Sequence, residues 1–267
     1  MRIITLLSDF GLEDGYVAAM KGVIAGIAPE ARLVDITHLV PPQDVAFARF
    51  RLLTVAPFFP AGTVHLVVVD PGVGTARRAL AVQSRTGSLY VGPDNGVLTG
   101  ALEADPPAAA VELSEPGFWR TPAPSATFHG RDIFSPVAAH LARGAALESL
   151  GHAVPVDQLV KLELPPREMV PGGARGAVQA VDRFGNLISN VPGTLLAGRG
   201  AWNASIAGRT VPGHRTYGDV LPNEPLALVG SHGFVEIAVH GGDARSALAA
   251  RVGDRVEIHW GDQPSRS

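Results

Sequence analysis

Apolar positions divide this chain into two parts with different periodicities. In residues 1–165, short apolar runs alternate with stretches in which apolar residues recur every three or four positions. The runs predict buried strands and the stretches predict amphipathic helices, so this part is expected to form an α/β domain with a mostly parallel sheet. The expected strands are 3–7, 33–36, 63–69, 80–83 and 89–91, and the expected helices are 16–27, 44–58 and 132–142.

The pattern changes after Leu164. Closely spaced prolines and glycines predict a linker over residues 166–174. Beyond it, apolar runs separated by Gly or Pro predominate, which predicts a smaller all-β domain, a sandwich or barrel, over residues 175–267. The expected strands in this part are 176–181, 187–191, 226–229, 234–239 and 256–260.

Composition narrows the class of protein. Hydrophobic residues make up 46% of the chain and charged residues 18%, which is typical of a globular protein. A net charge of −3 without a basic cluster argues against a nucleic-acid partner, and the absence of cysteine excludes disulfides and cysteine nucleophiles. No apolar run approaches about 18 residues and Met1 leads directly into a strand. We therefore expect a cytoplasmic protein without a signal peptide or membrane contact, and the Ala-, Gly- and Arg-rich composition is typical of a GC-rich bacterium.

One loop combines an acid and a base at the end of a strand. Asp70 follows the apolar strand 63–69, a Pro-Gly-Val-Gly turn comes next, and Arg77 ends the loop. Polar groups at the carboxyl end of a strand are how α/β proteins face a ligand crevice. Residues 7–11, 127–132 and 182–186 have a similar character, and the functional interpretation depends on all four segments together.

The first strand ends at another carboxylate, Asp9. A carboxylate at the mouth of a parallel sheet suits ribose hydroxyls. No glycine-rich phosphate-binding motif follows this strand, which disfavours a phosphate-rich nucleotide. Asp14 lies near the start of the next helix and is as readily interpreted as a helix cap.

Asp70, Arg77 and His129 form a water-handling cluster if the fold brings the strand ends together. Taken singly, Asp70 and Arg77 read equally well as a structural ion pair, and His129 as an ordinary loop histidine. A metal site on Asp9, Asp70 and His129 also stays open, although the chain has no recurrent metal-ligand spacing.

Residues 182–186, Asp-Arg-Phe-Gly-Asn, read first as a tight turn of a β-hairpin. In the functional interpretation, the amide of Asn186 has a donor and an acceptor that match an edge of adenine. Phe184 and Tyr217 would supply faces for the base. Ser231, next to His232, offers a hydroxyl to a carboxylate.

Six motifs in a fixed order identify a family resemblance. The chain resembles the S-adenosyl-L-methionine (SAM) hydroxide adenosyltransferases, relatives of the fluorinase and chlorinase, from Ile4 to about Trp260. The resemblance implies an α/β domain, a barrel-like domain, and a homotrimer with active sites between neighbouring subunits. The motifs are Ser-Asp-Phe-Gly (8–11), Asp-Pro-Gly-Val-Gly-Thr-x-Arg (70–77), Gly-Pro-Asp-Asn-Gly (92–96), Thr-Phe-His-Gly-Arg-Asp (127–132), Asp-x-Phe-Gly-Asn (182–186) and Gly-Ser-x-Gly (230–233).

The resemblance also implies roles for individual residues. Asp70, Arg77 and His129 match the triad of the water-using members, whereas the fluorinase has Tyr at the position of Asp70, Ser at that of Gly130, and a long insertion in hairpin 84–88. The other positions implied are Asp9 for ribose, Asp14 and Asp182 for the methionine ammonium, Ser231 for the amino-acid portion, Asn186, Phe184 and Tyr217 for adenine, and Phe128 as a further substrate contact.

The expected reaction is hydrolysis of SAM to adenosine and L-methionine by attack of water or hydroxide on C5′, with no cofactor and no metal. Arg77 is too weak a base to take the proton, so we expect it to orient the water while Asp70 and His129 receive the proton. His232 stands where the fluorinase has arginine, and residues 239–241 are unusual for the family. The alternatives are a SAM-dependent halogenase, an adenosyl-ligand binding protein without turnover, and a divalent-metal hydrolase.

Overall fold

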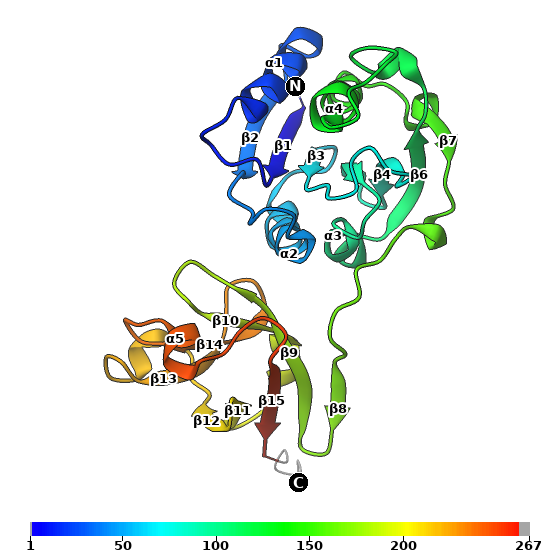
Figure 1. Cartoon of the computed structure of the whole chain (residues 1–267). Helices are drawn as coiled ribbons and strands as arrows, with labels where there is room; N and C mark the ends of the chain where they lie inside the picture. The colour runs from blue at the N-terminus through cyan, green and yellow to red at the C-terminus, as the bar shows by residue number, and fades with distance from the viewer. Residues whose placement is uncertain (1, 262–267) are drawn as a thin grey trace. The chain divides into compact units, whose positions relative to one another are not determined.

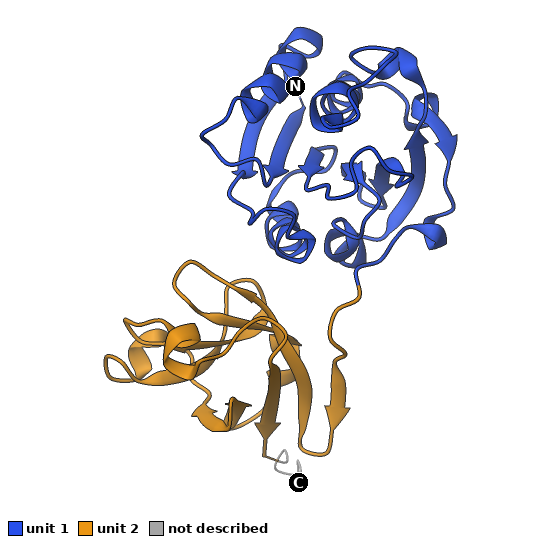
Figure 2. Cartoon of the chain, in the orientation of Figure 1, with its two compact units in different colours: residues 1–162 blue, residues 163–267 orange. Residues whose placement is uncertain are grey.

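The computed structural model describes residues 2–261, and the contacts within the chain divide it into units of residues 1–162 and 163–267 (Figure 2). The first unit carries a seven-stranded sheet and the second an eight-stranded sheet. This order confirms the predicted α/β domain followed by a smaller all-β domain.

The first sheet is mixed and has the strand order β2-β1-β3-β5-β4-β6-β7. Its first half pairs in parallel, β2 with β1, β1 with β3 and β3 with β5, while the remaining pairs are antiparallel. The carboxyl ends of β1 and β3 therefore lie side by side. The strands are β1 Ile3–Ser8, β2 Arg32–Thr37, β3 Val64–Val68, β4 Ala79–Ser84, β5 Leu89–Pro93, β6 Pro107–Leu113 and β7 Gly151–Ala153.

Helices cover both faces of this sheet (Figure 1). Ile4 and Leu6 of β1 pack with residues of α1 and α4 in one apolar cluster, whereas Leu7 of the same strand packs with residues of α2 and α3 in another. This alternation is what buries β1 on both faces. The helices are α1 Tyr16–Ile27, α2 Val45–Val55, α3 Thr99–Ala104 and α4 Ser135–Ala142.

Two helix expectations differ in detail from the structure. The helix expected over 132–142 begins with a π-helical turn, Gly130–Phe134, which leads into α4. The helix expected over 44–58 is capped by the carboxylate of Asp44 on the Phe47 amide and tightens at Ala56–Phe58 into a 3₁₀ turn that contains Pro57. The other short 3₁₀ turns are Pro116–Phe118, Leu147–Leu150, Val156–Gln158, Gly193–Leu196 and Tyr217–Asp219.

The second unit is an antiparallel, nearly closed barrel with the order β12-β11-β15-β9-β10-β14-β13. A bridge between Gly213, just after β12, and Ala227 of β13 brings the two edges together. One apolar cluster fills its interior. The elements are β8 Glu168–Val170, β9 Gly173–Val181, β10 Leu187–Pro192, β11 Trp202–Ile206, β12 Arg209–Pro212, β13 Pro225–Val229, β14 Phe234–Val239, α5 Ala244–Leu248 and β15 Arg255–Trp260.

The segment expected to be a linker is partly sheet. Residues 168–170 form β8, which pairs with the start of β9. Pro171 and Gly172 make the connection between the two strands, and Gly172 has a positive φ of 69°. The same two residue types punctuate hairpins and linkers, which is why the sequence pattern alone predicted a linker here.

Candidate active site

A cleft of about 230 Å³ lies at the carboxyl ends of β1 and β3. Asp9, just after β1, lines one part of it, and Asp70, two residues after β3, lines another. Phe128 and His129, which immediately precede the π-helical turn, complete the set of predicted residues at this cleft. The structure thus brings together side chains from distant parts of the sequence, such as Asp9 and His129.

Arg77 connects the acid and the imidazole of this cleft. Its Nε atom lies 2.9 and 3.0 Å from the two carboxylate oxygens of Asp70, and its Nη2 atom also contacts Asp70. The same Nη2 lies 2.7 Å from Nδ1 of His129. The side chains of Arg77 and Asp70 are only 10% and 6% exposed. A buried, multiply bonded guanidinium fixes both partners in place.

The position of Arg77 also determines which ring nitrogen of His129 carries the proton. A guanidinium only donates, so Nδ1 of His129 accepts, and in the neutral ring the proton is on Nε2. Burial, together with the charge of Arg77, lowers the pKa of His129 and favours this neutral form. His129 therefore offers an N–H donor from Nε2.

Close packing fixes the turn between Asp70 and Arg77. Gly74 has a φ of 76°, and a Cβ there would lie 2.5 Å from the carbonyl oxygen of Ala126. Only glycine fits at this point. The contact joins the turn after β3 to the loop that leads to His129.

A buried carboxylate anchors that second loop. Asp132, whose side chain is 1% exposed, accepts from Nε of Arg120 at 2.5 Å, from Nε of Arg131 at 2.7 Å and from the Ser125 amide at 2.9 Å. The hydrogen bond from Arg131, assisted by that from Arg120, holds the pKa of Asp132 well below its usual range. The loop that carries Phe128 is therefore fastened at both ends.

Aromatic rings and a glycine shape the apolar part of the site. Phe128 packs edge-on against Phe10 and Tyr16, with centroid distances of 5.6 and 5.1 Å. A Cβ at Gly130 would lie 3.1 Å from Cγ1 of Val68 and 3.3 Å from Cε2 of Phe128. This glycine sits in a space with little room for a larger side chain.

The two acidic residues of the first loop differ in their surroundings. The carboxylate of Asp9 accepts from the backbone amide of Gln43 at 2.8 Å, which holds it at the cleft. Asp14 is exposed, and the N-cap position of α1 is Gly15, with no side-chain cap bond. The capping interpretation of Asp14 is therefore wrong.

The remaining predicted residues belong to the second unit. Asp182 accepts from the amides of Phe184 and Asn186 and from Nδ2 of Asn186, all at 2.9 Å, so it organises the β9–β10 turn. Asn186 is buried, and its Oδ1 is left as an acceptor. The rings of Phe184 and Tyr217 are exposed, at 75% and 41%.

Ser231 is exposed in the β13–β14 turn. In the β10–β14 pair, Leu187 faces Ile237 and Pro192 faces Phe234. The turn of Asn186 and the turn of Ser231 therefore lie at opposite ends of this strand pair.

Sequence reasoning missed a buried carboxylate in the second unit. Glu236 of β14 accepts from the Tyr217 hydroxyl at 2.5 Å and lies 3.0 Å from Nε2 of His232. The amide of Phe234 donates to Nδ1 of His232, so the proton of this ring is on Nε2. Burial and Glu236 both raise the pKa of Tyr217. A single acid within the apolar run 234–239 was the available signal.

The carboxylates at the cleft are bonded to groups of the protein itself. Within residues 2–261, no three His, Asp or Glu side chains are grouped so that they could hold a metal ion. Both oxygens of Asp70 are bonded to Arg77 instead. In the same range, no helix is long and apolar enough to cross a bilayer.

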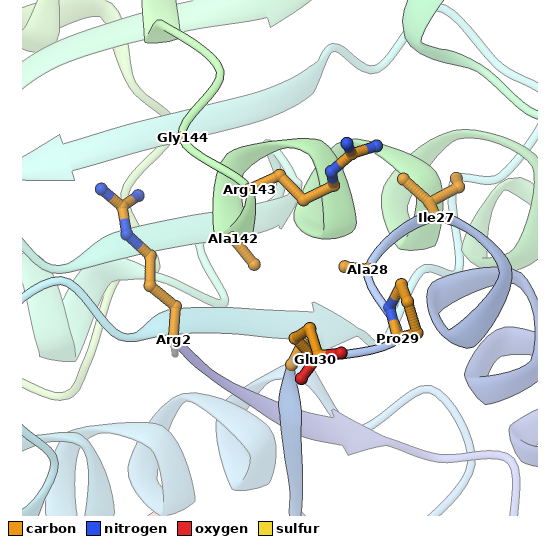
Figure 3. Close-up of a pocket in the computed structure, with 9 residues that line it drawn as sticks. Arg2, Ile27, Ala28, Pro29, Glu30, Ala142, Arg143 and Gly144 are labelled. Carbon is orange, nitrogen blue, oxygen red and sulfur yellow. The ribbon is translucent and has the colours of Figure 1, made fainter.

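A second cleft, of about 630 Å³, lies at the other end of β1. Figure 3 shows Arg2, Glu30 and Arg143 among the residues that line it. Arg2 donates to the carbonyl of Leu141 at 2.8 Å and so satisfies the C-terminal end of α4. Among the described residues, the charged side chains of this second cleft form no bonded cluster like that of Asp70, Arg77 and His129, so the smaller cleft is the candidate active site.

Comparison with known families agrees with this geometry. The model of the SAM hydroxide adenosyltransferase N-terminal domain matches residues 4–151, and that of the C-terminal domain matches residues 176–257. The chain belongs to the SAM hydroxide adenosyltransferase family. The first of these two ranges contains the whole cleft with Asp70, Arg77 and His129.

Individual relatives of this SAM hydroxide adenosyltransferase cover nearly its full length. An (R)-S-adenosyl-L-methionine hydrolase of Thermus thermophilus is 46% identical over 97% of this chain and 100% of its own. A hydrolase of the same name from Salinispora arenicola is 46% identical over 97% of this chain and 98% of its own. A fluorinase of an Actinoplanes species is 32% identical over 73% of each chain.

A solved structure has the same fold as this family member. A conserved protein of Thermotoga maritima superposes with a TM-score of 0.90 at 38% identity, over 96% of this chain and 99% of its own.

Proposed function

We propose that this chain hydrolyses S-adenosyl-L-methionine to adenosine and L-methionine. The observation that carries the proposal is the series of contacts from Asp70 through Arg77 to His129 beside a cleft. The hydrolase relatives at 46% identity support the same reaction. Their name specifies the (R) configuration at sulfur, and we extend the proposal to that sulfonium epimer.

The reaction needs an activated water and little else. The water oxygen forms a bond to C5′, the C5′–S bond breaks, and its electron pair stays on sulfur as a neutral thioether. One proton leaves the water. Because the leaving group is neutral, no acid is required at sulfur, and a base near the attacking oxygen is the group that helps.

The contacts of the triad assign different roles to its members. Arg77 holds the other two and does not take a proton, because its pKa is too high. His129 donates from Nε2 to the water oxygen and orients it. Asp70, whose oxygens retain acceptor capacity beyond the bonds to Arg77, receives the proton. Of the two acceptors expected from the sequence, the tautomer of His129 favours Asp70 alone.

Recognition of the substrate completes the proposal. Asp9 is suited to the ribose hydroxyls, and Phe128 to the apolar wall near C5′. Asn186, Phe184 and Tyr217 are suited to adenine, while Asp14, Asp182 and Ser231 are suited to the amino-acid portion. We also propose the homotrimer that the family resemblance implies and a cytoplasmic location, which light scattering and cell fractionation would test.

Isotope labelling tests the reaction directly. The purified protein is incubated with each sulfonium epimer of SAM in oxygen-18 water, with and without chloride, and the nucleoside is analysed by mass spectrometry. We expect labelled adenosine from the (R) epimer, and its loss in Asp70→Ala. Unlabelled adenosine, a chlorinated nucleoside, or bound SAM without turnover would overturn the proposal in favour of another mechanism, a halogenase or a binding protein.

A further inference from the structure

The turn 92–96, Gly-Pro-Asp-Asn-Gly, is one of the six sequence motifs, and the proposed reaction gives it no task. Its first two residues are the last two of β5, which lies between β3 and β4 in the sheet. β3 leads to Asp70, and β4 begins just after Arg77. The turn thus lies between the two ends of the loop that carries these residues.

The entry of that loop is held by Asn95. Its Nδ2 atom donates to the carbonyl oxygen of Val69 at 2.9 Å, directly before Asp70. Its Oδ1 atom accepts from the amide of Val97 at 3.1 Å, which fixes the orientation of the side-chain amide. A half-buried amide that is oriented at one end and bonded at the other is a rigid support.

The exit of the loop is held by Asp94. Its backbone amide donates to the carbonyl of Arg78 at 2.9 Å, directly after Arg77. Its carboxylate, which is 4% exposed, accepts from Nε of Arg78 at 2.8 Å, and Nη2 of Arg78 lies 2.5 Å from the same oxygen as an ion pair. Asp94 and Asn95 are therefore hydrogen-bonded to the chain on both sides of the Asp70–Arg77 loop.

The same turn also contacts the last residues of the first unit. The second oxygen of Asp94 accepts from the amide of Val160 at 2.8 Å. A Cβ at Gly96, which has a φ of 89°, would lie 2.7 Å from the amide nitrogen of Leu162. Val160 and Leu162, which are among the last residues of the first unit, therefore contact this turn.

We propose that Asp94 and Asn95 are positioning residues that set the geometry of Asp70, Arg77 and His129. The inference rests on the proposed hydrolysis. Neither residue lines the cleft, so each acts through the loop and not through the substrate. Displacement of catalytic groups by about 1 Å can cost about 100-fold in rate. Loss of the hydrogen bonds from Asp94 and Asn95 to this loop should therefore lower kcat and leave substrate affinity almost unchanged.

The test uses Asn95→Asp, which keeps the size and the Val97 contact but removes the donor to Val69. Asp94→Asn is the second variant, because it weakens the pair with Arg78 and keeps an acceptor for Val160. Asp105→Asn is the matched control: Asp105 accepts from the Thr86 amide at 3.2 Å at the opposite end of the β4–β5 hairpin. All are assayed with (R)-SAM at a temperature where circular dichroism shows them folded.

We expect kcat to fall about 30- to 100-fold in Asn95→Asp and Asp94→Asn, with KM within about twofold of the native value. The control should keep both. As a readout independent of turnover, the ¹⁵N NMR signals of the His129 ring, assigned with His129→Gln, should move in the two variants and not in the control. Unchanged kcat and unchanged ring signals in folded variants would overturn the inference. Native protein without hydrolysis would instead overturn the proposed function.

Discussion

The two units differ in the partners of their buried acids. One region is the loop that carries Asp70 and Arg77, and the other is the pair of turns that carry Phe184 and Tyr217. In the first unit, an acid and a base are buried against each other and bonded through several atoms. In the second unit, the buried acid Glu236 is held by a hydroxyl and by a neutral imidazole, while aromatic rings are exposed. A preformed ionic cluster suits chemistry on a small nucleophile. Exposed rings suit a flat ligand that covers them.

The largest expected effect tests the ionic cluster. Arg77→Lys should lower kcat for (R)-SAM about 100- to 1000-fold, because one ammonium cannot reproduce the fork that joins Asp70 to His129. Adenosine formation followed by chromatography measures it, and Arg32→Lys on the exposed edge of β2 is the control. A fully active Arg77→Lys would show that charge alone suffices and would remove the contrast between the units.

The contacts of Glu236 in the second unit are tested by measuring the free energy of unfolding. Tyr217→Phe leaves Glu236 with one donor fewer, so the free energy of unfolding of the second unit should fall by about 1–3 kcal/mol. Urea unfolding followed by tryptophan fluorescence in a Trp119→Phe background reports this unit, because Trp202 and Trp260 both lie in it. The penalty should shrink when Glu236→Gln is also present. An equal penalty in both backgrounds would contradict the assigned contact.

A smaller effect is expected at the exposed ring. Phe184→Ala should raise KM about 10-fold, as expected for loss of one stacking face, with kcat unchanged. Because the ring is 75% exposed, the free energy of unfolding should change by no more than about 0.5 kcal/mol. Steady-state kinetics and urea unfolding give the two numbers. A fall in kcat at constant KM would place this residue with the chemistry instead.

The smallest effect is a shift in titration. Burial and Arg77 lower the pKa of His129, so its neutral, active form should persist to a pH below 6.5 and activity should fall only on further acidification. Arg77→Gln removes the repelling charge, so the pKa should rise. NMR titration of the ring measures it in both proteins. A pKa that falls in Arg77→Gln would mean that Arg77 does not repel the proton.

Sequence patterns were informative where a strand ends in unusual chemistry. The acid after β3 and the paired arginine were identifiable because polar groups at the carboxyl end of an apolar strand face the ligand crevice of α/β proteins. Strand β6, Pro107–Leu113, was not predicted, because its run of alanines has no strand-like alternation and gains its conformation from pairing with β4. Helix α3 is six residues long, which is less than two helical turns, and was missed because so short a segment shows no repeating apolar spacing.

The details of the site depended on contacts that no pattern contains. Which nitrogen of His129 carries the proton follows from the place of Arg77, and that place is set by the packing of Gly74 on Ala126. The bond from Asn95 to Val69 is between residues 26 positions apart. Such information is three-dimensional, and a single sequence does not supply it.

The crowding around Gly130 distinguishes a substitution there from a substitution at Asp70. A side chain gained there would press on Val68 and Phe128 while the ionic cluster was still intact. Loss of Asp70 would release Arg77 and His129 without any such collision. A larger side chain at residue 130 therefore requires Val68 and Phe128 to move, whereas a smaller side chain at residue 70 requires no such movement.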